Sequence, residues 1–184
     1  MADEHRDFSL RDLEGRPHAF PTGEPSLVCF VKEDCQTCNL AAPAIDAFHK
    51  RFGAAASVWF VGQSAEGNAI LKDRHGLTAP ILDDSACAVS FAWDFEIVPA
   101  VYWTDGEGRV QKQLEGFVRD EWRELEQAIA ADLGDTAAGV DWSIYPEWRP
   151  GCGSKHLDPV IPKKADETAA KVIVALSRNI LGGK

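Results

Sequence analysis

Two cysteines separated by two residues, Cys35 and Cys38, are the side chains of this sequence best suited to chemistry. They follow a compact apolar run, residues 26–31, and open a segment with apolar residues at helical spacing, residues 36–52. A thiol at a helix N-terminus is stabilised as the thiolate by unpaired backbone N–H groups and by the helix dipole. A second thiol one turn along the helix can resolve a mixed disulfide by intramolecular attack. The pair therefore predicts thiol–disulfide exchange, with Cys35 as the nucleophile and Cys38 as the resolving thiol.

The residues around each cysteine predict how reactive its thiol is. Glu33 and Asp34 precede the pair, and their negative charges are expected to raise the pKa of the Cys35 thiol against the helix dipole. Cys29 lies in the middle of an apolar run, and Cys87 lies among small and apolar residues. Because unpaired cysteine is commonly a small buried hydrophobe, we predict that Cys29 and Cys87 are core residues.

Cys152 is a candidate third redox thiol. It lies in residues 149–156, a stretch rich in Pro and Gly that predicts no regular element. Lys155 and His156 follow it, and their positive charge would favour a thiolate at Cys152. The alternative is a turn that happens to contain a cysteine, and the residues leave both interpretations open.

Hydrophobic periodicity and turn residues mark the elements that position these thiols. They predict a hairpin over residues 8–20, strands over residues 26–31, 57–61, 98–103 and 109–114, and helices over residues 36–52, 67–75, 86–92 and 120–133. Strands that alternate with helices and end in a hairpin predict an α/β fold, with a central mixed β-sheet flanked by helices.

The composition and the hydrophobic periodicity of the sequence change after Gly134. We therefore predict a redox domain over residues 1–134 and a C-terminal extension over residues 135–184. The extension begins with an irregular segment rich in Pro, Gly and Trp that contains Cys152, and it ends in a predicted helix over residues 165–181. Three aromatic residues of the irregular segment are expected to pin it onto the main domain. They are Trp142, Tyr145 and Trp148.

Residues 6–134 resemble the redoxin branch of the thioredoxin-like superfamily, which includes TlpA- and ResA-like reductases and, more distantly, peroxiredoxins and alkyl hydroperoxide reductases. The resemblance lies in the N-terminal hairpin, the strand–Cys35-Gln-Thr-Cys38–helix unit, Pro43 in that helix, and the Val98-Pro99 step. It implies a thioredoxin-like fold and a thiol–disulfide oxidoreductase. It also implies that Pro99 is cis and faces the cysteines, and that the backbone of Val98 helps to dock the substrate. The sequence departs from thioredoxin itself, which has Gly-Pro between its cysteines and a buried Asp at the position of Cys29.

Two other functions use the same cysteines. In a peroxiredoxin-type thiol peroxidase, Cys38 would attack peroxide, and Cys35, Cys87 or Cys152 would resolve the sulfenic acid. In a non-catalytic zinc-binding module, Cys35, Cys38, Cys152 and His156 would supply four ligands of suitable type.

The composition of the chain disfavours some classes of binding partner. Hydrophobic residues make up 45% of the 184 residues, and the formal net charge of −10 disfavours nucleic acid and anionic membranes as partners. No apolar run approaches the roughly 20 residues of a membrane-spanning helix. The first residues, 1–7, lack the basic and apolar regions of a secretory signal, so we expect a cytoplasmic protein. The expected partners are a protein or small-molecule disulfide, or a peroxide, and an upstream thiol reductant. No cofactor and no metal are expected.

Overall fold

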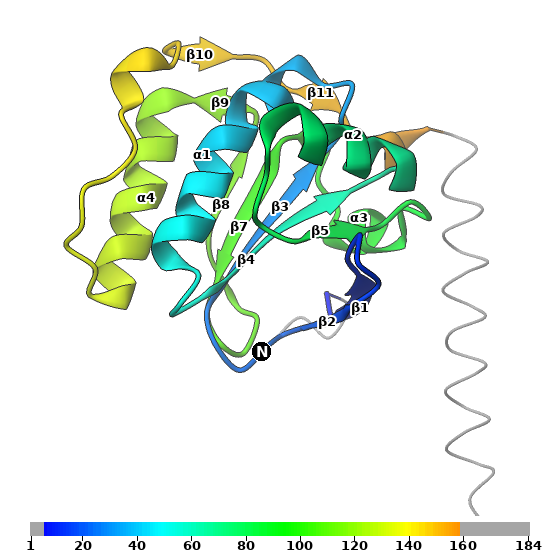
Figure 1. Cartoon of the computed structure of the whole chain (residues 1–184), viewed down its shortest axis with the longest axis horizontal. Coiled ribbons are helices and arrows are strands. Elements are labelled where there is room, and N and C mark those ends of the chain that lie inside the picture. Colours follow the sequence, from blue (N-terminus) through cyan, green and yellow to red (C-terminus); the bar gives the residue numbers. More distant parts are fainter. Residues whose placement is uncertain (1–5, 159–184) are drawn as a thin grey trace, which may run out of the picture.

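A five-stranded mixed β-sheet is the centre of the fold (Figure 1). The computed structural model describes residues 6–158 of the chain. The strands lie in the order β5 (Ile81–Asp83), β4 (Ser57–Gly62), β3 (Ser26–Val31), β7 (Ala100–Thr104) and β8 (Val110–Glu115). β3 pairs in parallel with β4, and β4 with β5, whereas β7 runs antiparallel to both of its neighbours. The predicted mixed sheet is confirmed.

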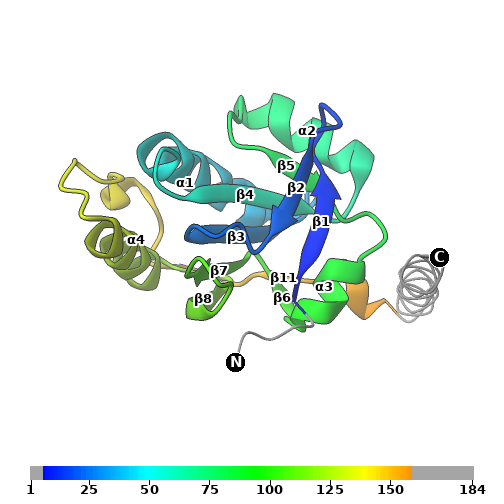
Figure 2. The same cartoon turned by 90° about the horizontal axis from the view of Figure 1, so that it is seen from below.

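The central strand β3 is buried along its whole length because elements cover both faces of the sheet. Helices α1 (Gln36–Phe52) and α4 (Arg119–Leu133) lie together on one face, and the short helix α3 (Ala88–Trp93) lies with the N-terminal hairpin on the other (Figure 2). The ring of Trp93 packs against the ring of Phe30 from β3, with 5.3 Å between their centroids. Helix α1 has the bounds that its apolar spacing predicted.

The predicted hairpin consists of β1 (Phe8–Arg11) and β2 (Pro17–Phe20), which pair antiparallel. The carboxylate of Asp12 accepts hydrogen bonds from two backbone N–H groups of the turn, at 3.0 Å and 2.9 Å. Gly15 has a φ of +80°, a left-handed conformation that glycine adopts without steric cost. The turn is therefore stabilised by local chemistry that the sequence displays.

Helix α2 (Ala65–His75) begins two residues before the predicted start. The reason is a cap: the Ser64 hydroxyl accepts a hydrogen bond from the backbone N–H of Gly67. The edge strand β5 was not predicted, because three residues are too few to show a periodicity.

Helix α3 begins at Ala88, later than the predicted residue 86, because Cys87 adopts a left-handed conformation with a φ of +56°. The helix is stabilised by Asp84, whose carboxylate accepts hydrogen bonds from the backbone N–H groups of Val89 and Ser90. The anchor therefore lies outside the helix that it stabilises.

The predicted strand over residues 98–103 is two strands. β6 (Ile97–Val98) ends just before Pro99, and β7 begins just after it. Proline has no backbone N–H to donate, so it interrupts the ladder at this point. β6 leaves the central sheet and pairs with a segment from the C-terminal part of the chain.

Residues 135–158 contain short regular elements where an irregular segment was predicted. These are two 3-10 turns over Trp142–Ile144 and Lys155–Leu157, and two strands, β10 (Trp148–Arg149) and β11 (Cys152–Gly153). β10 pairs with β9 (Phe117–Val118), and β11 pairs with β6, both antiparallel. The predicted helix over residues 165–181 lies outside the described residues.

Two of the three predicted aromatic anchors hold this segment. The indole N–H of Trp142 donates to the Glu126 carboxylate at 2.7 Å, and the ring of Tyr145 stacks on that of Phe117 with 5.7 Å between centroids. The prediction was wrong for Trp148, whose side chain is 63% exposed. The backbone of Trp148 pairs with β9, and this pairing leaves its ring at the surface.

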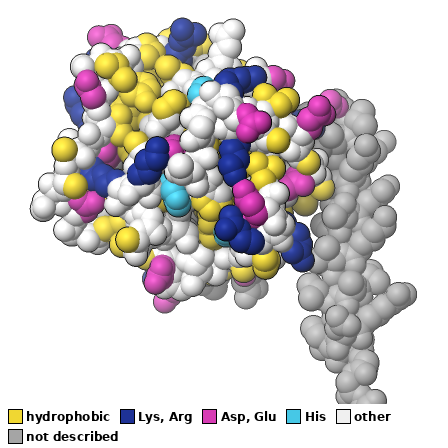
Figure 3. Space-filling view, in the orientation of Figure 1, with side chains coloured by type: hydrophobic (Ala, Val, Ile, Leu, Met, Phe, Trp, Pro, Cys, Tyr) yellow, Lys and Arg dark blue, Asp and Glu magenta, His cyan; other side chains and the backbone are white. Residues whose placement is uncertain are grey.

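Positive and negative side chains are interspersed over the face shown in Figure 3, so that face presents no large patch of one charge. Within residues 6–158, none of the helices has both the length and the apolar character that crossing a membrane requires.

Candidate active site

Cys35 is the N-cap residue of helix α1. Its sulfur accepts a hydrogen bond from the backbone N–H of Cys38 at 3.3 Å, so it occupies the place of a helix-capping oxygen. The side-chain amide of Asn39 donates to the carbonyl oxygens of Glu33 and Cys35, at 2.8 Å and 2.9 Å. These contacts hold the loop that carries Cys35 in one conformation.

The carbonyl group of Val98, in the Val98-Pro99 step, lies beside this sulfur, in the place that the family resemblance implied. The peptide bond between Val98 and Pro99 is cis. The carbonyl oxygen of Val98 lies 3.7 Å from the sulfur of Cys35, and it accepts a hydrogen bond from this sulfur when Cys35 is protonated. The site thus joins the start of helix α1 to the end of β6, more than sixty residues further along the chain.

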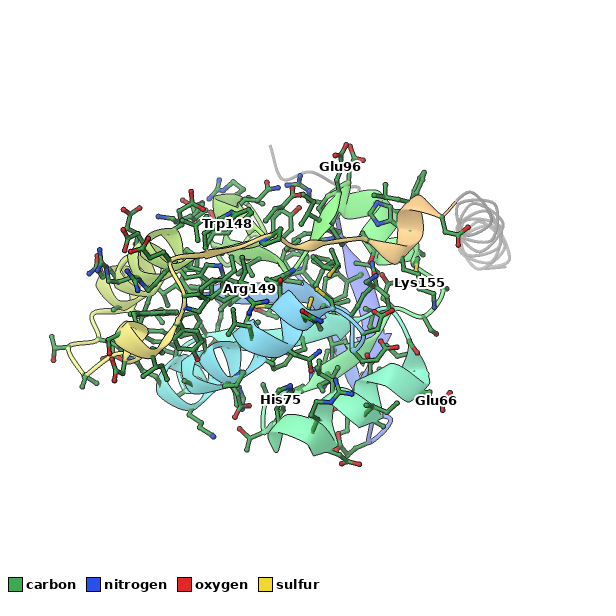
Figure 4. The ribbon with its side chains drawn as sticks, turned by 90° about the horizontal axis from the view of Figure 1, so that it is seen from above. Glu66, His75, Glu96, Trp148, Arg149 and Lys155 are labelled. Carbon is green, nitrogen blue, oxygen red and sulfur yellow. The ribbon has the colours of Figure 1, made fainter. Side chains whose placement is uncertain are left out.

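A third thiol completes the site. β11 pairs with β6 so that Cys152 lies opposite Val98 and Gly153 opposite Ile97. The thiol of Cys152 is within hydrogen-bonding reach of the sulfur of Cys35. Figure 4 shows residues 148–155 crossing above the N-terminal end of α1. We call residues 148–157 the covering segment.

Hydrogen bonds favour the thiolate of Cys35. Its pKa is lowered to about 5, chiefly because the Cys38 thiol donates to the thiolate, with further donation from the Cys152 thiol and from the backbone N–H groups of Cys38 and Thr37. Burial opposes this effect but does not outweigh it. The pKa of Cys38 is raised well above the ordinary value by its own burial and by the adjacent Cys35. One sulfur is therefore prepared to attack, and the other holds the proton.

The prediction that acidic neighbours raise the pKa of Cys35 was wrong. The side chain of Asp34 is 71% exposed and lies 3.6 Å from the ammonium group of Lys32, so solvent and a counter-charge screen it. The donors to Cys35 contact the sulfur directly. Their effect on the pKa of Cys35 therefore outweighs that of the screened charge on Asp34.

Lys155 and His156 were predicted to favour a thiolate at Cys152 through their positive charge, but neither does so. The ammonium group of Lys155 donates to the carbonyl oxygen of Gln63 at 3.1 Å. His156 is buried, and burial lowers its pKa. The pKa of Cys152 is raised by burial and by the neighbouring Cys35, while Lys32 acts weakly in the opposite sense.

The remaining candidate residues do not join the site. Cys29 and Cys87 are buried, as predicted for core residues. The imidazole of His156 lies beside the ring of Phe95 and bonds the Ser154 hydroxyl through Nδ1, at 2.6 Å. Within residues 6–158, no group of three or more His, Cys, Asp or Glu side chains is arranged to hold a metal ion. The four ligands of the zinc alternative are therefore not brought together.

Sequence reasoning missed the polar side chains that hold the covering segment. The hydroxyl of Thr37, between the two cysteines, donates to the carbonyl oxygen of Pro150. The side-chain amide of Gln63 donates to the hydroxyls of Ser90 and Ser154, at 2.8 Å and 2.7 Å. No local pattern marks these residues, because each acts on a partner distant in sequence.

Titration of Cys35 in the reduced protein is expected to show a midpoint near pH 5, measured by thiolate absorbance at 240 nm. Cys35→Ser should remove this transition. Because the pKa of Cys35 in the folded state lies below the unfolded value of about 8.5, ionisation of this group stabilises the reduced protein fully above about pH 8.5. That contribution shrinks as the pH falls from about 8.5 to about 5, and it is lost below pH 5. A midpoint near 8 or above, in the range of an ordinary thiol, would contradict the described hydrogen bonds.

Comparisons with known proteins identify the fold. The sequence matches no protein-family model and has no significant match among curated proteins. Solved structures do resemble it. A secreted Mycobacterium tuberculosis disulfide oxidoreductase, homologous to Escherichia coli DsbE, is 19% identical with a TM-score of 0.60, and the match covers 71% of this chain and 99% of that chain.

Two further solved structures extend the comparison. StoA from Bacillus subtilis is 18% identical with a TM-score of 0.58, over 66% of this chain and 94% of its own. The bacterioferritin comigratory protein of Xanthomonas campestris, described with alkyl peroxide reduction activity, is 16% identical with a TM-score of 0.59, over 68% of this chain and 92% of its own. Because these neighbours are matched almost whole, this chain carries sequence that they lack. The likeness shows a common fold.

Proposed function

We propose that this chain, which has the thioredoxin-like fold, is a thiol–disulfide oxidoreductase whose redox pair is Cys35 and Cys38. The observation that carries the proposal is the pairing of a stabilised Cys35 sulfur at the N-terminus of α1 with a protonated Cys38 thiol that donates to it. An arrangement of this kind combines a nucleophile with a resolving group on the same helix.

The reaction follows from the positions of the two sulfurs. The Cys35 thiolate attacks one sulfur of a partner disulfide, whose bond breaks and whose other sulfur leaves as a thiolate that takes a proton from solvent. Cys38 then loses its proton and attacks the sulfur of Cys35, and the partner leaves as a second thiolate. The partner is reduced to two thiols, and the chain holds a Cys35–Cys38 disulfide. An upstream thiol reductant restores the two thiols.

The geometry does not favour Cys38 as a peroxidatic residue. Burial and the adjacent Cys35 raise its pKa well above the ordinary value, so it is held as the thiol, whereas the thiolate is the form that attacks peroxide. The nucleophile of the site is Cys35, which is the position expected for disulfide exchange.

Trapping of a mixed disulfide tests the proposal. In Cys38→Ser/Cys152→Ser, the Cys35 thiolate is expected to open a peptide that contains one internal disulfide. Alkylation of the freed peptide thiol then prevents the reverse reaction, and the peptide stays on Cys35 because the site has no second thiol to resolve the bond. Mass spectrometry without reduction would find the mass of the whole peptide added at Cys35. The matched variant Cys35→Ser/Cys152→Ser should form no adduct. An adduct at Cys38, or no adduct in either variant, would refute the assignment.

A further inference from the structure

The strand β11 already shows an extended peptide bound at the active site, with a cysteine presented to Cys35. Its antiparallel pairing with β6 places Cys152 opposite Val98, the residue whose carbonyl oxygen lies 3.7 Å from the Cys35 sulfur. A disulfide needs two cysteines whose sulfurs approach each other directly, and the two thiols are within hydrogen-bonding reach. The position of Cys152 is that of a substrate cysteine held by its own chain.

Contacts on both sides of Cys152 hold the strand in place. On one side, the Thr37 hydroxyl donates to the carbonyl oxygen of Pro150. On the other, the backbone N–H of Ser154 donates to the carbonyl oxygen of Glu96 at 2.9 Å. The hydroxyl of Ser154 also accepts from the side-chain amide of Gln63. The strand is therefore part of a built site.

Gly151 shows how closely the strand approaches β6. A Cβ atom at this position would lie 2.1 Å from the Cγ2 of Ile97 and 2.5 Å from the carbonyl oxygen of Val98. The second contact is with backbone, so the strand would have to move away to accommodate any side chain. A Cβ atom at Gly153, by contrast, would meet nothing within 4 Å. Gly151, just before β11, and Gly153, within it, therefore offer a matched pair of substitutions.

The three thiols differ in their exposure to solvent, and Cys152 is the most accessible of them. Cys35 is 1% exposed and Cys38 is 0% exposed, whereas Cys152 is half-buried. With the covering segment in place, a reactant from solvent meets the sulfur of Cys152 before it meets the redox pair.

We propose that Cys152 is a third redox thiol, which exchanges disulfides with Cys35 within the chain and passes electrons from an external dithiol to the redox pair. This inference rests on the proposed function. In the oxidised chain, Cys152 as a thiolate attacks the sulfur of Cys35, the Cys35–Cys38 bond breaks, and Cys38 leaves and takes up a proton. A thiolate of the external dithiol then attacks Cys152, and the Cys35–Cys152 bond breaks with Cys35 leaving as a thiolate. The second thiol of the donor releases Cys152 and closes the donor disulfide.

The pKa values of the sulfurs favour the second step, in which the external thiolate attacks Cys152 and Cys35 leaves. Thiol–disulfide exchange is faster when the leaving sulfur has a low pKa, and Cys35 has the lowest pKa of the three. External attack on the accessible sulfur of Cys152 therefore expels the best leaving group of the site.

The test uses Cys38→Ser, in which Cys152 is the one thiol left beside Cys35. After treatment with the peptide disulfide, we expect the peptide to be released as a dithiol and a Cys35–Cys152 disulfide to form within the chain, as mapped by mass spectrometry without reduction. The same experiment on Cys38→Ser/Gly151→Ala should slow formation of this bond by about tenfold or more, because the two thiols lose their high effective concentration. Cys38→Ser/Gly153→Ala should form it at an unchanged rate. Circular dichroism of each variant checks that it is folded.

The outcomes separate this inference from the proposed function. If Cys38→Ser keeps the peptide on Cys35, or if Cys152 instead pairs with a second chain, the third redox thiol is refuted while the redox pair stands. If the double variant without Cys38 and Cys152 forms no adduct, the proposed function itself fails. In the wild-type background, Cys152→Ser should still form the Cys35–Cys38 disulfide but be reduced more slowly by dithiothreitol. Equal rates of reduction would contradict the transfer through Cys152.

Discussion

Replacing Cys35 with serine is expected to abolish disulfide exchange, with a loss of rate on the order of 10³-fold or more, because the nucleophile itself is removed. The Cys35 sulfur is the group that receives hydrogen bonds from the N-terminus of α1 and from two neighbouring thiols. A serine hydroxyl does not ionise near neutral pH and cannot form a disulfide. Reduction of a peptide disulfide, followed by the thiols that appear, measures the effect.

Cys29→Ala is the matched control for this experiment. Cys29 is a wholly buried residue of β3, and burial raises the pKa of its thiol far above the range of a reactive cysteine. Its removal should leave the rate of exchange unchanged within about twofold, and any loss of stability would arise from the small cavity. If Cys35→Ser retained more than a small fraction of the rate, another cysteine would be the nucleophile.

Replacing Glu126 with alanine is expected to lower the free energy of unfolding by about 3 kcal/mol or more, as is typical when one partner of a buried ion pair is removed. The carboxylate of Glu126 lies 2.8 Å from the guanidinium group of Arg51, and the side chains are 6% and 14% exposed. It also accepts hydrogen bonds from the backbone N–H of Val140 and the indole N–H of Trp142. All three donors would lose this acceptor, although Arg51 would keep its ion pair with Asp135.

Glu124→Ala, on the same helix, is the control for Glu126→Ala. The side chain of Glu124 is 62% exposed and lies 3.7 Å from the Lys112 ammonium group, so its removal should change stability by about 0.5 kcal/mol or less. Urea denaturation of both variants, followed by circular dichroism, measures the difference. Similar values for the two variants would mean that the buried carboxylate does not hold the C-terminal segment to the core.

Local patterns carried enough information to predict much of the main domain. The apolar run over residues 26–31 and the helical spacing over residues 36–52 predicted β3 and α1 with their observed bounds. They did so because a fully buried strand appears in the sequence as a continuous apolar run, and an amphipathic helix appears as apolar residues at helical spacing. The cysteine pair at the junction of these elements indicated the site, since the helix N-terminus that activates a thiol is itself a local feature.

The surroundings of the site were less predictable. Glu33 and Asp34 are neighbours of Cys35 along the chain, and for that reason they were expected to disfavour its thiolate. In the folded protein, the groups that act on this sulfur are hydrogen-bond donors, one of which comes from Cys152. The pKa of a buried thiol depends on which groups contact it, and adjacency in sequence is a poor guide to contact.

The mixed α/β fold and the cysteine pair at the start of a helix follow from the sequence, because short-range periodicity and turn residues encode both. The pairing of β11 with β6, which brings Cys152 to Cys35, is visible only in the folded chain. A two-residue strand has no periodicity to detect, and its partner lies more than fifty residues earlier in the chain. The close approach at Gly151 and the hydrogen bond from Thr37 to Pro150 depend on that pairing. Neither a glycine nor a threonine at these positions indicates such a contact in the sequence. Contacts between segments that are distant in sequence arise from the packing of the whole chain, and local sequence patterns do not predict them.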